Sequence, residues 1–316
     1  MCENARTNLL KSYAQPKSIY VEIDIAADLE VVWATTQTPE LHERWDLRFN
    51  EIKYLPKAGN EPQRFLYSTR IGFGLKIEGE GQSIAEKTSS DGPTSALRSW
   101  SVDSKSLILK GSGYWQYRPI ELGTKFLTGY NYETRFGPIG MGFDRVFFRP
   151  LIRWATAWSF DTLRLWLEKG VPPEASRDRA AIHLAARLAL AFVWVYQGLV
   201  PKLLFSETGE LAIMRRAHLP GASPETWLAL LGSAEVLFGI VIVVFWRSKG
   251  IIRLQMATLV AFTLAAWRSY PRMFVEPSNP VSLNMLLLIL SAIVLVADRD
   301  LPSAHNCKRN KPTEPE

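Results

Sequence analysis

The stretch Pro224–Trp246, PETWLALLGSAEVLFGIVIVVFW, decides the architecture of the chain, because beyond its first turn it carries a single charged residue, Glu235. Three further apolar blocks lie at Ala180–Phe205, Ile251–Trp267 and Pro280–Ala297. At a rise of about 1.5 Å per residue, the two longer blocks cross a hydrocarbon core of about 30 Å, and the two shorter ones span about 26 to 27 Å. The sequence therefore predicts an all-α bundle of four transmembrane helices.

The average composition hides the division between this bundle and the part of the chain that precedes it. A mean hydropathy of -0.02 with 47% hydrophobic residues would also fit an ordinary globular protein. The net charge of +6 would ordinarily suggest a nucleic acid partner. Many of the extra Lys and Arg residues flank the apolar blocks, however, as they do in membrane proteins. We therefore expect a lipid bilayer as the partner, and no nucleic acid.

The charges around the blocks predict an orientation in the membrane. Met1–Lys17 is polar and has no apolar core of a secretory signal, so the N-terminal part should remain in the cytoplasm. With four spans, nine basic residues lie on that side and five on the other, which favours both termini inside. The nine are Arg177, Arg179, Arg247, Lys249, Arg253, Arg299, Lys308, Arg309 and Lys311; the five are Lys202, Arg215, Arg216, Arg268 and Arg272. The expected location is the inner membrane of a bacterial cell.

Only two cysteines occur, Cys2 and Cys307, one in each terminal tail. A structural disulfide is not expected in the cytoplasm, and thiol oxidoreductases need paired, accessible cysteines. The sequence also shows no metal-spaced ligand cluster, no nucleophile elbow and no Ser-His-Asp constellation. His42, the one histidine of the N-terminal part, stands at the end of a predicted surface helix, where we expect it to be solvated. No catalytic residue is proposed, and an enzyme is the less favoured reading.

The N-terminal part reads as a strand, two short helices, about six strands and a long helix. Ile19–Ile25 alternates apolar and polar residues, and short helical patterns follow from Asp28 to Trp45. The long helix is expected at Phe143–Glu168, closed by Gly170. The later strands are expected at Glu51–Leu55, Arg64–Ile71, Leu75–Glu86, Thr94–Val102, Gly113–Pro119 and Lys125–Thr134.

This order, with Trp45-Asp46 after the second short helix, resembles the START-like superfamily, also called SRPBCC or polyketide-cyclase-like, over Pro16–Lys169. The resemblance implies an α+β helix-grip fold, in which a curved antiparallel sheet grips a long C-terminal helix around a cavity for an apolar ligand. Candidates for the cavity lining are Trp45, Tyr67, Trp115, Tyr117, Tyr130 and Tyr132. The alternative is that these aromatic side chains simply fill the core.

Arg145, Arg149 and Arg153 recur every four residues on the predicted long helix, close to the point where the chain enters the bilayer. Two interpretations remain open for this basic stripe: a solvated face, or a surface that docks on anionic lipid headgroups.

Polar residues inside the predicted spans require a partner or a function. Arg187 and Glu235 lie at similar depths on neighbouring helices, which suggests a buried salt bridge or a proton-linked or ligand-binding pair. A bis-histidine haem is not expected, since His183 is the one histidine of the four blocks. A quinone remains possible as a bound cofactor, held by Trp194, Gln197 and Asn284.

Three motifs in the bundle occur in the order of the DoxX-like family of small four-helix membrane proteins. They are Arg187–Leu203, Gly232–Glu235 and Asn279–Asn284, and the resemblance covers Ala180–Ala297. It implies a link to membrane redox complexes and to a quinone-reducing thiosulfate oxidoreductase. Carried over as possible site residues are Arg187, Gln197, Glu235 and Asn284.

The expected organisation has five parts. They are a disordered tail at 1–16, a helix-grip domain at 17–170, a linker at 171–179, the membrane domain at 180–298 and a polar tail at 299–316. The favoured function is membrane-anchored binding or transfer of a hydrophobic small molecule, such as a lipid, an isoprenoid or a quinone-like compound. The alternatives are a subunit of a quinone-linked redox complex, with a partner subunit in the membrane, and a structural or scaffold protein.

Overall fold

The computed structural model describes residues 18–57, 59, 61–71, 74–89, 91–207, 209–217, 220–269, 271–275 and 279–311. The chain divides into two compact units. One comprises Met1–Ser176 together with Pro302–Glu316, and we call it the helix-grip unit. The other comprises Arg177–Leu301, and we call it the bundle. The predicted disordered tail 1–16 and Cys2 lie outside the described residues.

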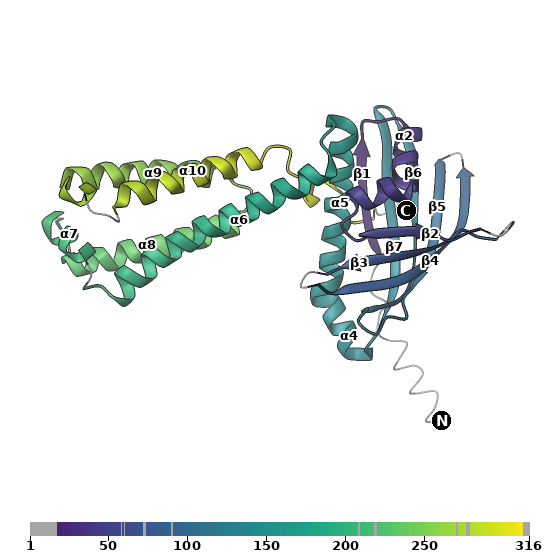
Figure 1. Ribbon diagram of the computed structural model, residues 1–316, viewed down its shortest axis with the longest axis horizontal. Coiled ribbons are helices and arrows are strands. Elements are labelled where there is room, and N and C mark those ends of the chain that lie inside the picture. The colour runs from purple at the N-terminus through teal and green to yellow at the C-terminus, as the bar shows by residue number, and fades with distance from the viewer. Residues whose placement is uncertain are drawn as a thin grey trace, which may run out of the picture. The chain divides into compact units, whose positions relative to one another are not determined.

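The helix-grip unit is built on one antiparallel sheet in the order β1-β7-β6-β5-β4-β3-β2 (Figure 1). Its strands are β1 (Ile19–Ile25), β2 (Glu51–Tyr54), β3 (Arg64–Arg70), β4 (Lys76–Ser89), β5 (Gly92–Trp100), β6 (Ile108–Ile120) and β7 (Gly123–Thr134). The first two strands form opposite edges, so α2 (Leu29–Gln37) and α3 (Pro39–Trp45) carry the chain from one edge to the other. The long helix α5 (Arg149–Lys169) packs on β1, which confirms the predicted helix-grip fold.

Apolar alternation explains this packing. Ile19, Val21, Ile23 and Ile25 point from β1 into a core that includes Phe160 of α5. We call the sheet face that carries these residues the inner face.

The helical region before α5 starts earlier than predicted. It begins with α4 (Gly137–Phe143) and continues through a π-helical turn, η1 (Asp144–Phe148). Phe136 and Gly137 both have positive φ angles, 68° and 52°, and Pro138 then supplies a preset helical φ. Gly137 and Pro138 therefore start a helix. The end was predicted correctly, since Gly170 closes α5 in the left-handed conformation with φ 65°.

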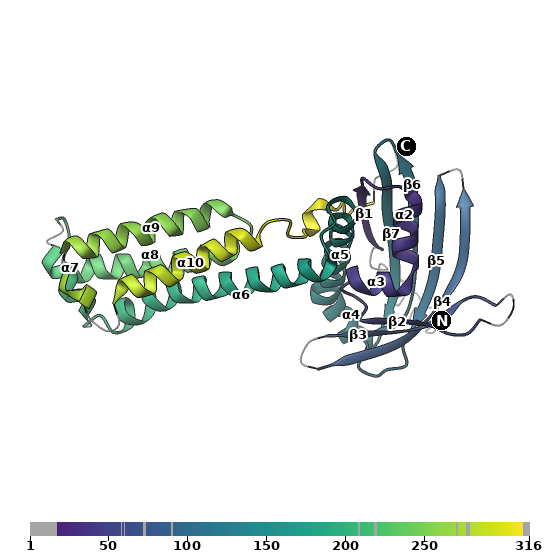
Figure 2. The same cartoon turned by 45° about the horizontal axis from the view of Figure 1, so that its top comes forward.

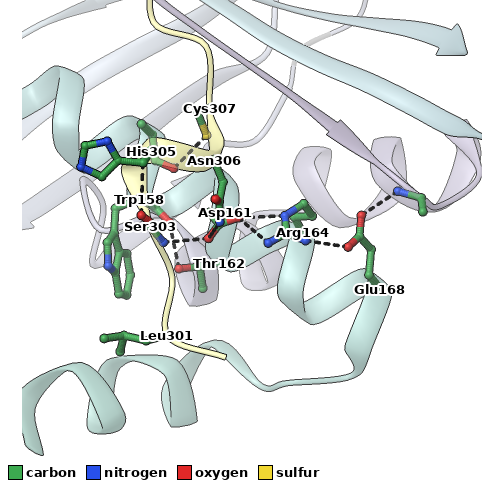
Figure 3. A network of polar contacts seen from close by, with 12 residues as sticks. Trp158, Asp161, Thr162, Arg164, Glu168, Leu301, Ser303, His305, Asn306 and Cys307 are labelled. Carbon is green, nitrogen blue, oxygen red and sulfur yellow. Dashed lines mark hydrogen bonds and ion pairs between the residues drawn. The ribbon is translucent and has the colours of Figure 1, made fainter. Parts of the chain in front are cut away.

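The C-terminal residues 302–311 return to the helix-grip unit, and we call them the clasp. Lys308 exchanges two backbone hydrogen bonds of 2.9 Å with Glu22 on the edge strand β1. Asp161, fully buried on α5, accepts from the Ser303 amide at 2.7 Å and from the Asn306 side chain at 2.9 Å (Figure 3). Cys307 is a free, buried thiol 3.2 Å from the Ala157 carbonyl oxygen. The polar tail is thus tied into the domain at its sheet edge and on its long helix.

The bundle contains α6 (Pro173–Gly198), η2 (Leu199–Leu204), α7 (Gly209–Ala217), α8 (Pro224–Val244), α9 (Lys249–Ser269), η3 (Pro271–Val275) and α10 (Pro280–Ala297) (Figure 2). Three helical segments are long and apolar enough to cross a membrane, Pro173–Leu204, Pro224–Val244 and Lys249–Arg268, while α10 is shorter. The first begins before the expected Ala180, because Pro173 occupies a first-turn position that tolerates proline and starts the helix within the predicted linker.

Glycines bring α6 and α8 into close contact. A Cβ on Gly198 would lie 2.4 Å from the Gly232 carbonyl oxygen, and one on Gly239 would lie 2.8 Å from the Ala191 carbonyl oxygen. Neither glycine can therefore be replaced without moving a helix. Small residues that let two helix backbones approach closely are typical of helix contacts in membranes.

Candidate functional site

Two tyrosines lie flat on the inner face of the sheet, each above glycines of neighbouring strands. Tyr67 on β3 pairs with Gly79 on β4, and Tyr130 on β7 pairs with Gly113 on β6. A Cβ on Gly79 would come within 2.4 Å of the Tyr67 ring, and one on Gly111 within 2.4 Å of the Tyr130 hydroxyl. The missing side chains make room for the rings, so both tyrosines are half-buried and present one ring face above the sheet.

Ser99 of β5 is the polar side chain next to these hydroxyls. The Ser99 and Tyr130 hydroxyls are 3.5 Å apart, and Ser99 acts to lower the pKa of Tyr67. Burial raises the pKa of both tyrosines, while the hydrogen bond from Ser99 opposes that rise. Both hydroxyls therefore stay protonated at neutral pH and can donate hydrogen bonds.

Arg48 and Asp46 form an ion pair. Arg48 binds Asp46 through two hydrogen bonds, Nε to Oδ1 at 2.9 Å and Nη2 to Oδ2 at 2.6 Å. Burial raises the pKa of Asp46, but the charge of Arg48 and the hydrogen bonds from His42 and Arg48 outweigh it, so the pKa is lowered and Asp46 is ionised. The positive charge of Arg48 also acts to lower the pKa of Tyr130, against the larger effect of burial, which raises it. Nη1 of Arg48 has no hydrogen-bond partner among the described residues.

Aromatic rings surround the charged pair. His42 stacks on Trp45 with ring centroids 5.0 Å apart and meets the edges of Phe49 at 5.3 Å and Trp115 at 4.9 Å. Its Nε2 lies 3.0 Å from Asp46 Oδ2, and its side chain is only 12% exposed. The expectation of a solvated His42 was therefore wrong. Residues 42, 45 and 46 share the face of α3 that packs on the sheet, and the i, i+4 spacing of His42 and Asp46 was the signal in the sequence that could have found this group.

The six predicted aromatic residues divide into two sets. Trp45 and Tyr117 are core residues, fully buried, and the Tyr117 hydroxyl is 2.6 Å from Thr36 Oγ1. The Tyr132 hydroxyl donates to Asp144 before α5, and the Arg149 guanidinium lies 4.4 Å above the Tyr132 ring. These three side chains are buried in the core. Half-buried on the inner face are Tyr67, Trp115 and Tyr130.

Two pockets occur in the unit, and Tyr67 lines one of them. One, of about 320 Å³, is lined by Glu22, Ile23, Asp24, Arg164, Asn306 and Lys308 beside the clasp. The other, of about 240 Å³, is lined by Glu51, Lys53, Leu66, Tyr67, Ser68, Lys76, Glu78 and Gly79. Charged residues dominate both, and neither contains Arg48 or Tyr130.

The basic stripe on the long helix is not continuous. Arg149 pairs with Asp144 at 2.9 Å, and Arg153 donates to the Arg309 carbonyl and the Asn310 side chain of the clasp. Of the three arginines, only Arg145 is exposed. The structure thus corrects the expected stripe, because two of its members are engaged within the unit.

In the bundle, the expected pair Arg187–Glu235 does not form. Arg187 instead donates to the carbonyl oxygens of Ile242 at 2.9 Å, Phe245 at 2.8 Å and Ser248 at 2.8 Å. Ile242 lies in the last turn of α8, where helical carbonyls lack partners and carry partial negative charge, and Phe245 and Ser248 follow that helix end. Glu235 pairs with Lys202 at 2.8 Å, and Lys202 also reaches Glu210 at 2.8 Å. Lys202, expected in an external flank, is buried on the π-helical turn η2.

Two of the other predicted polar residues of the bundle have local contacts. The side chain of Asn284 on α10 donates to Thr263 Oγ1 of α9 at 2.7 Å. The backbone carbonyl of Gln197 accepts from Lys202 at 3.0 Å. The buried indole nitrogen of Trp194 has no partner in the described part of the chain.

Comparison with known sequences adds the family. The uncharacterized membrane protein YndG of Bacillus subtilis (strain 168) is 40% identical over 257 residues, which cover 76% of this chain and 94% of YndG. The chain belongs to the YndG family. The model of the DoxX-like family also matches residues 191–292, from the second half of α6 into α10. This YndG-family member is therefore a membrane protein that joins a helix-grip unit to a DoxX-like bundle.

Solved structures similar to this YndG-family chain share little sequence with it. TTHA0849 from Thermus thermophilus is 15% identical, covers 43% of this chain and 86% of its own, and has a TM-score of 0.34. The di-domain ARO/CYC StfQ from the steffimycin biosynthetic pathway is 10% identical, with 48% and 50% covered and a TM-score of 0.36. Protein SA2116 from Staphylococcus aureus is 14% identical, with 48% and 94% covered and a TM-score of 0.37. The fold assignment rests on the sheet order and helix packing described above.

Proposed function

We propose that the helix-grip unit binds a small molecule with an apolar body and an oxygen-rich head group, such as a fatty acid, another acidic lipid or a quinone-like compound, and that the bundle holds this unit at the membrane. One observation carries the proposal: Arg48, fixed by Asp46, has an uncommitted Nη1, and the hydroxyl-bearing residues Tyr67, Ser99 and Tyr130 share the inner face of the sheet.

The hydrogen-bond donors of the protein at this site favour a ligand whose head group carries acceptor oxygens. A guanidinium has donors and no acceptor, and hydroxyls can donate to the same kind of oxygen atom. A buried ion pair is expensive to maintain and is weak evidence for stability alone. The half-buried rings of Tyr67, Trp115 and Tyr130 provide apolar contact area next to these donors.

The test uses the full chain in lipid nanodiscs. Molecules extracted from wild type, from the double variant Tyr67→Phe with Tyr130→Phe, and from Tyr114→Phe are quantified by mass spectrometry. Tyr114 is the matched control, because its ring also lies above a glycine, Gly129, but on the opposite face of the sheet. We expect a copurified acidic or carbonyl-bearing lipid that the double variant loses and the control keeps. Equal amounts in all three proteins would reject the proposal.

The chain order supports four spans with both ends on one side of the membrane. Residues 18–176 and 302–311 belong to one unit, so the bundle between them must cross the bilayer an even number of times. Three segments have span length, and α10, with 18 residues, reaches about 27 Å and supplies the fourth crossing. The excess of basic residues on this side makes it the cytoplasmic one, in the inner membrane.

The quinone-linked alternative has one observation in its favour, the unpartnered indole N–H of Trp194 inside the bundle. It could donate to a quinone carbonyl. Under that reading, Trp194→Phe lowers quinone retention by the full chain, while Tyr67→Phe with Tyr130→Phe leaves it unchanged.

A further inference from the structure

An apolar surface runs along one side of α4, η1 and the first turns of α5. Ile139 is 84% exposed, Phe147 63% and Val146 62%. The members of this surface are Phe136, Ile139, Met141, Phe143, Val146, Phe147, Leu151 and Trp154, and all are exposed. The positions 139, 143, 147, 151 and 154 recur at helical spacing, so they form one continuous stripe. We call it the outer stripe.

The opposite side of the same helical run is occupied by the domain. Asp144 is buried and bonded to Tyr132, and Phe148 and Ile152 pack against the core. The helix therefore already packs against the domain through its other side, and the outer stripe is not needed for that packing. A water-soluble domain rarely exposes so many contiguous large apolar side chains unless they meet a partner.

We propose that the outer stripe lies in the interfacial region of the bilayer that the bundle of this chain spans. Two observations favour lipid as the partner. Only Gly170, Val171 and Pro172 separate the end of α5 from α6, the first membrane-spanning helix, so this tether keeps the unit at high effective concentration near lipid. Phe and Trp side chains with a nearby exposed arginine, here Arg145, are also the composition of helices that rest in a membrane interface.

In this arrangement the unit contacts the membrane by inserting apolar side chains, and not by electrostatic attraction between the arginine stripe and lipid headgroups. Apolar contact does not depend on anionic lipid, whereas attraction of arginines to headgroups is screened by salt. It also stands apart from the ligand proposal, because no residue of the outer stripe belongs to the Arg48 site.

The experiment reads lipid contact one position at a time. The full chain with Cys2→Ser carries an environment-sensitive fluorophore on Phe147→Cys or Ile139→Cys, in nanodiscs of phosphatidylcholine with or without brominated acyl chains. The remaining thiol, Cys307, is 7% exposed, and burial raises its pKa to about 12, so it does not compete for the label. Matched controls are Val102→Cys and Leu122→Cys, apolar positions that are 91% and 82% exposed outside the stripe.

We expect brominated lipid to cause a loss of fluorescence at 139 and 147 but not at 102 and 122, and the loss to persist at high salt. Equal fluorescence at all four positions in both lipids would overturn the proposal. A label at 147 that is shielded from water but insensitive to bromine, in nanodiscs with two copies of the chain, would overturn it in favour of a protein partner. Loss of quenching at high salt would also overturn it, because a contact that salt removes depends on attraction between arginines and lipid headgroups.

Discussion

Asp161→Asn should release the clasp while leaving the rest of the unit folded. The substitution keeps the shape of the side chain and removes its charge. Asp161 holds the Ser303 amide and the Asn306 side chain through Oδ2, and Arg164 through Oδ1 at 2.8 Å. A hydrogen bond to a charged group contributes about 1.5–3 kcal/mol and a neutral one about 1 kcal/mol. Two weakened bonds to the clasp therefore cost about 1–4 kcal/mol, a roughly 5- to 900-fold rise in the open population.

Cys307 reports this opening directly. Its thiol is buried in the closed clasp, so in Cys2→Ser protein its rate of alkylation follows the fraction of open molecules. The control is Glu168→Gln on the same helix, which also removes a carboxylate bound to Arg164, at 2.8 Å, and has no hydrogen bond to the clasp among the described contacts. We expect faster labelling in Asp161→Asn and little change in Glu168→Gln. Equal labelling in Asp161→Asn and wild type would refute the reasoning.

Three further predictions concern the bundle and the charged site. Gly198→Ala should destabilise the bundle by about 1–3 kcal/mol in thermal unfolding, because its Cβ meets a backbone oxygen, whereas Gly250→Ala, whose nearest neighbour is 3.6 Å away, should not. Lys202→Met should cost about 3–5 kcal/mol by leaving Glu235 unpaired, and adding Glu235→Met should recover most of the loss; no recovery would show that the pair is not the cause. Asp46 has a lowered pKa when folded, so its stabilising effect is present above its unfolded pKa of about 4 and is lost as the pH falls below that value. In Asp46→Asn, calorimetry should show a shallower fall of stability with acid; an unchanged slope would argue against the ion pair.

The sequence was sufficient wherever local patterns decide the structure. The alternation at Ile19–Ile25 predicted β1, and Gly170 predicted the end of α5. The apolar blocks predicted the helices of the bundle. These features depend on periodicity and backbone preference, which neighbouring residues determine.

Partners distant in the chain could not be predicted in the same way. The residues of the clasp are mostly polar and have no periodic pattern, and their position depends on Asp161, some 140 residues earlier. Arg187 was paired with Glu235 by depth alone, but three backbone carbonyls at and after the end of α8 offered acceptors. Lys202 looked external because a π-helical turn that extends α6 has no clear signal in the sequence.

Three residues of the proposed inner-face site were already candidates in the sequence. Tyr67, Trp115 and Tyr130 were chosen for their aromatic character, and the structure brings them to one face of the sheet. Arg48 and Ser99 were missed, since a single arginine and a single serine on separate elements give no pattern.

The location of the bound molecule tests the central claim most directly. A fatty acid with a diazirine in its chain is photo-crosslinked to the full chain in membranes, and the modified peptides are sequenced by mass spectrometry. We predict modification near Phe49, Tyr67 and Trp115 that competes with unlabelled fatty acid and disappears in the Tyr67→Phe, Tyr130→Phe variant. Modification confined to the bundle helices, or unaffected by that variant, would contradict a ligand site on the inner face of the sheet.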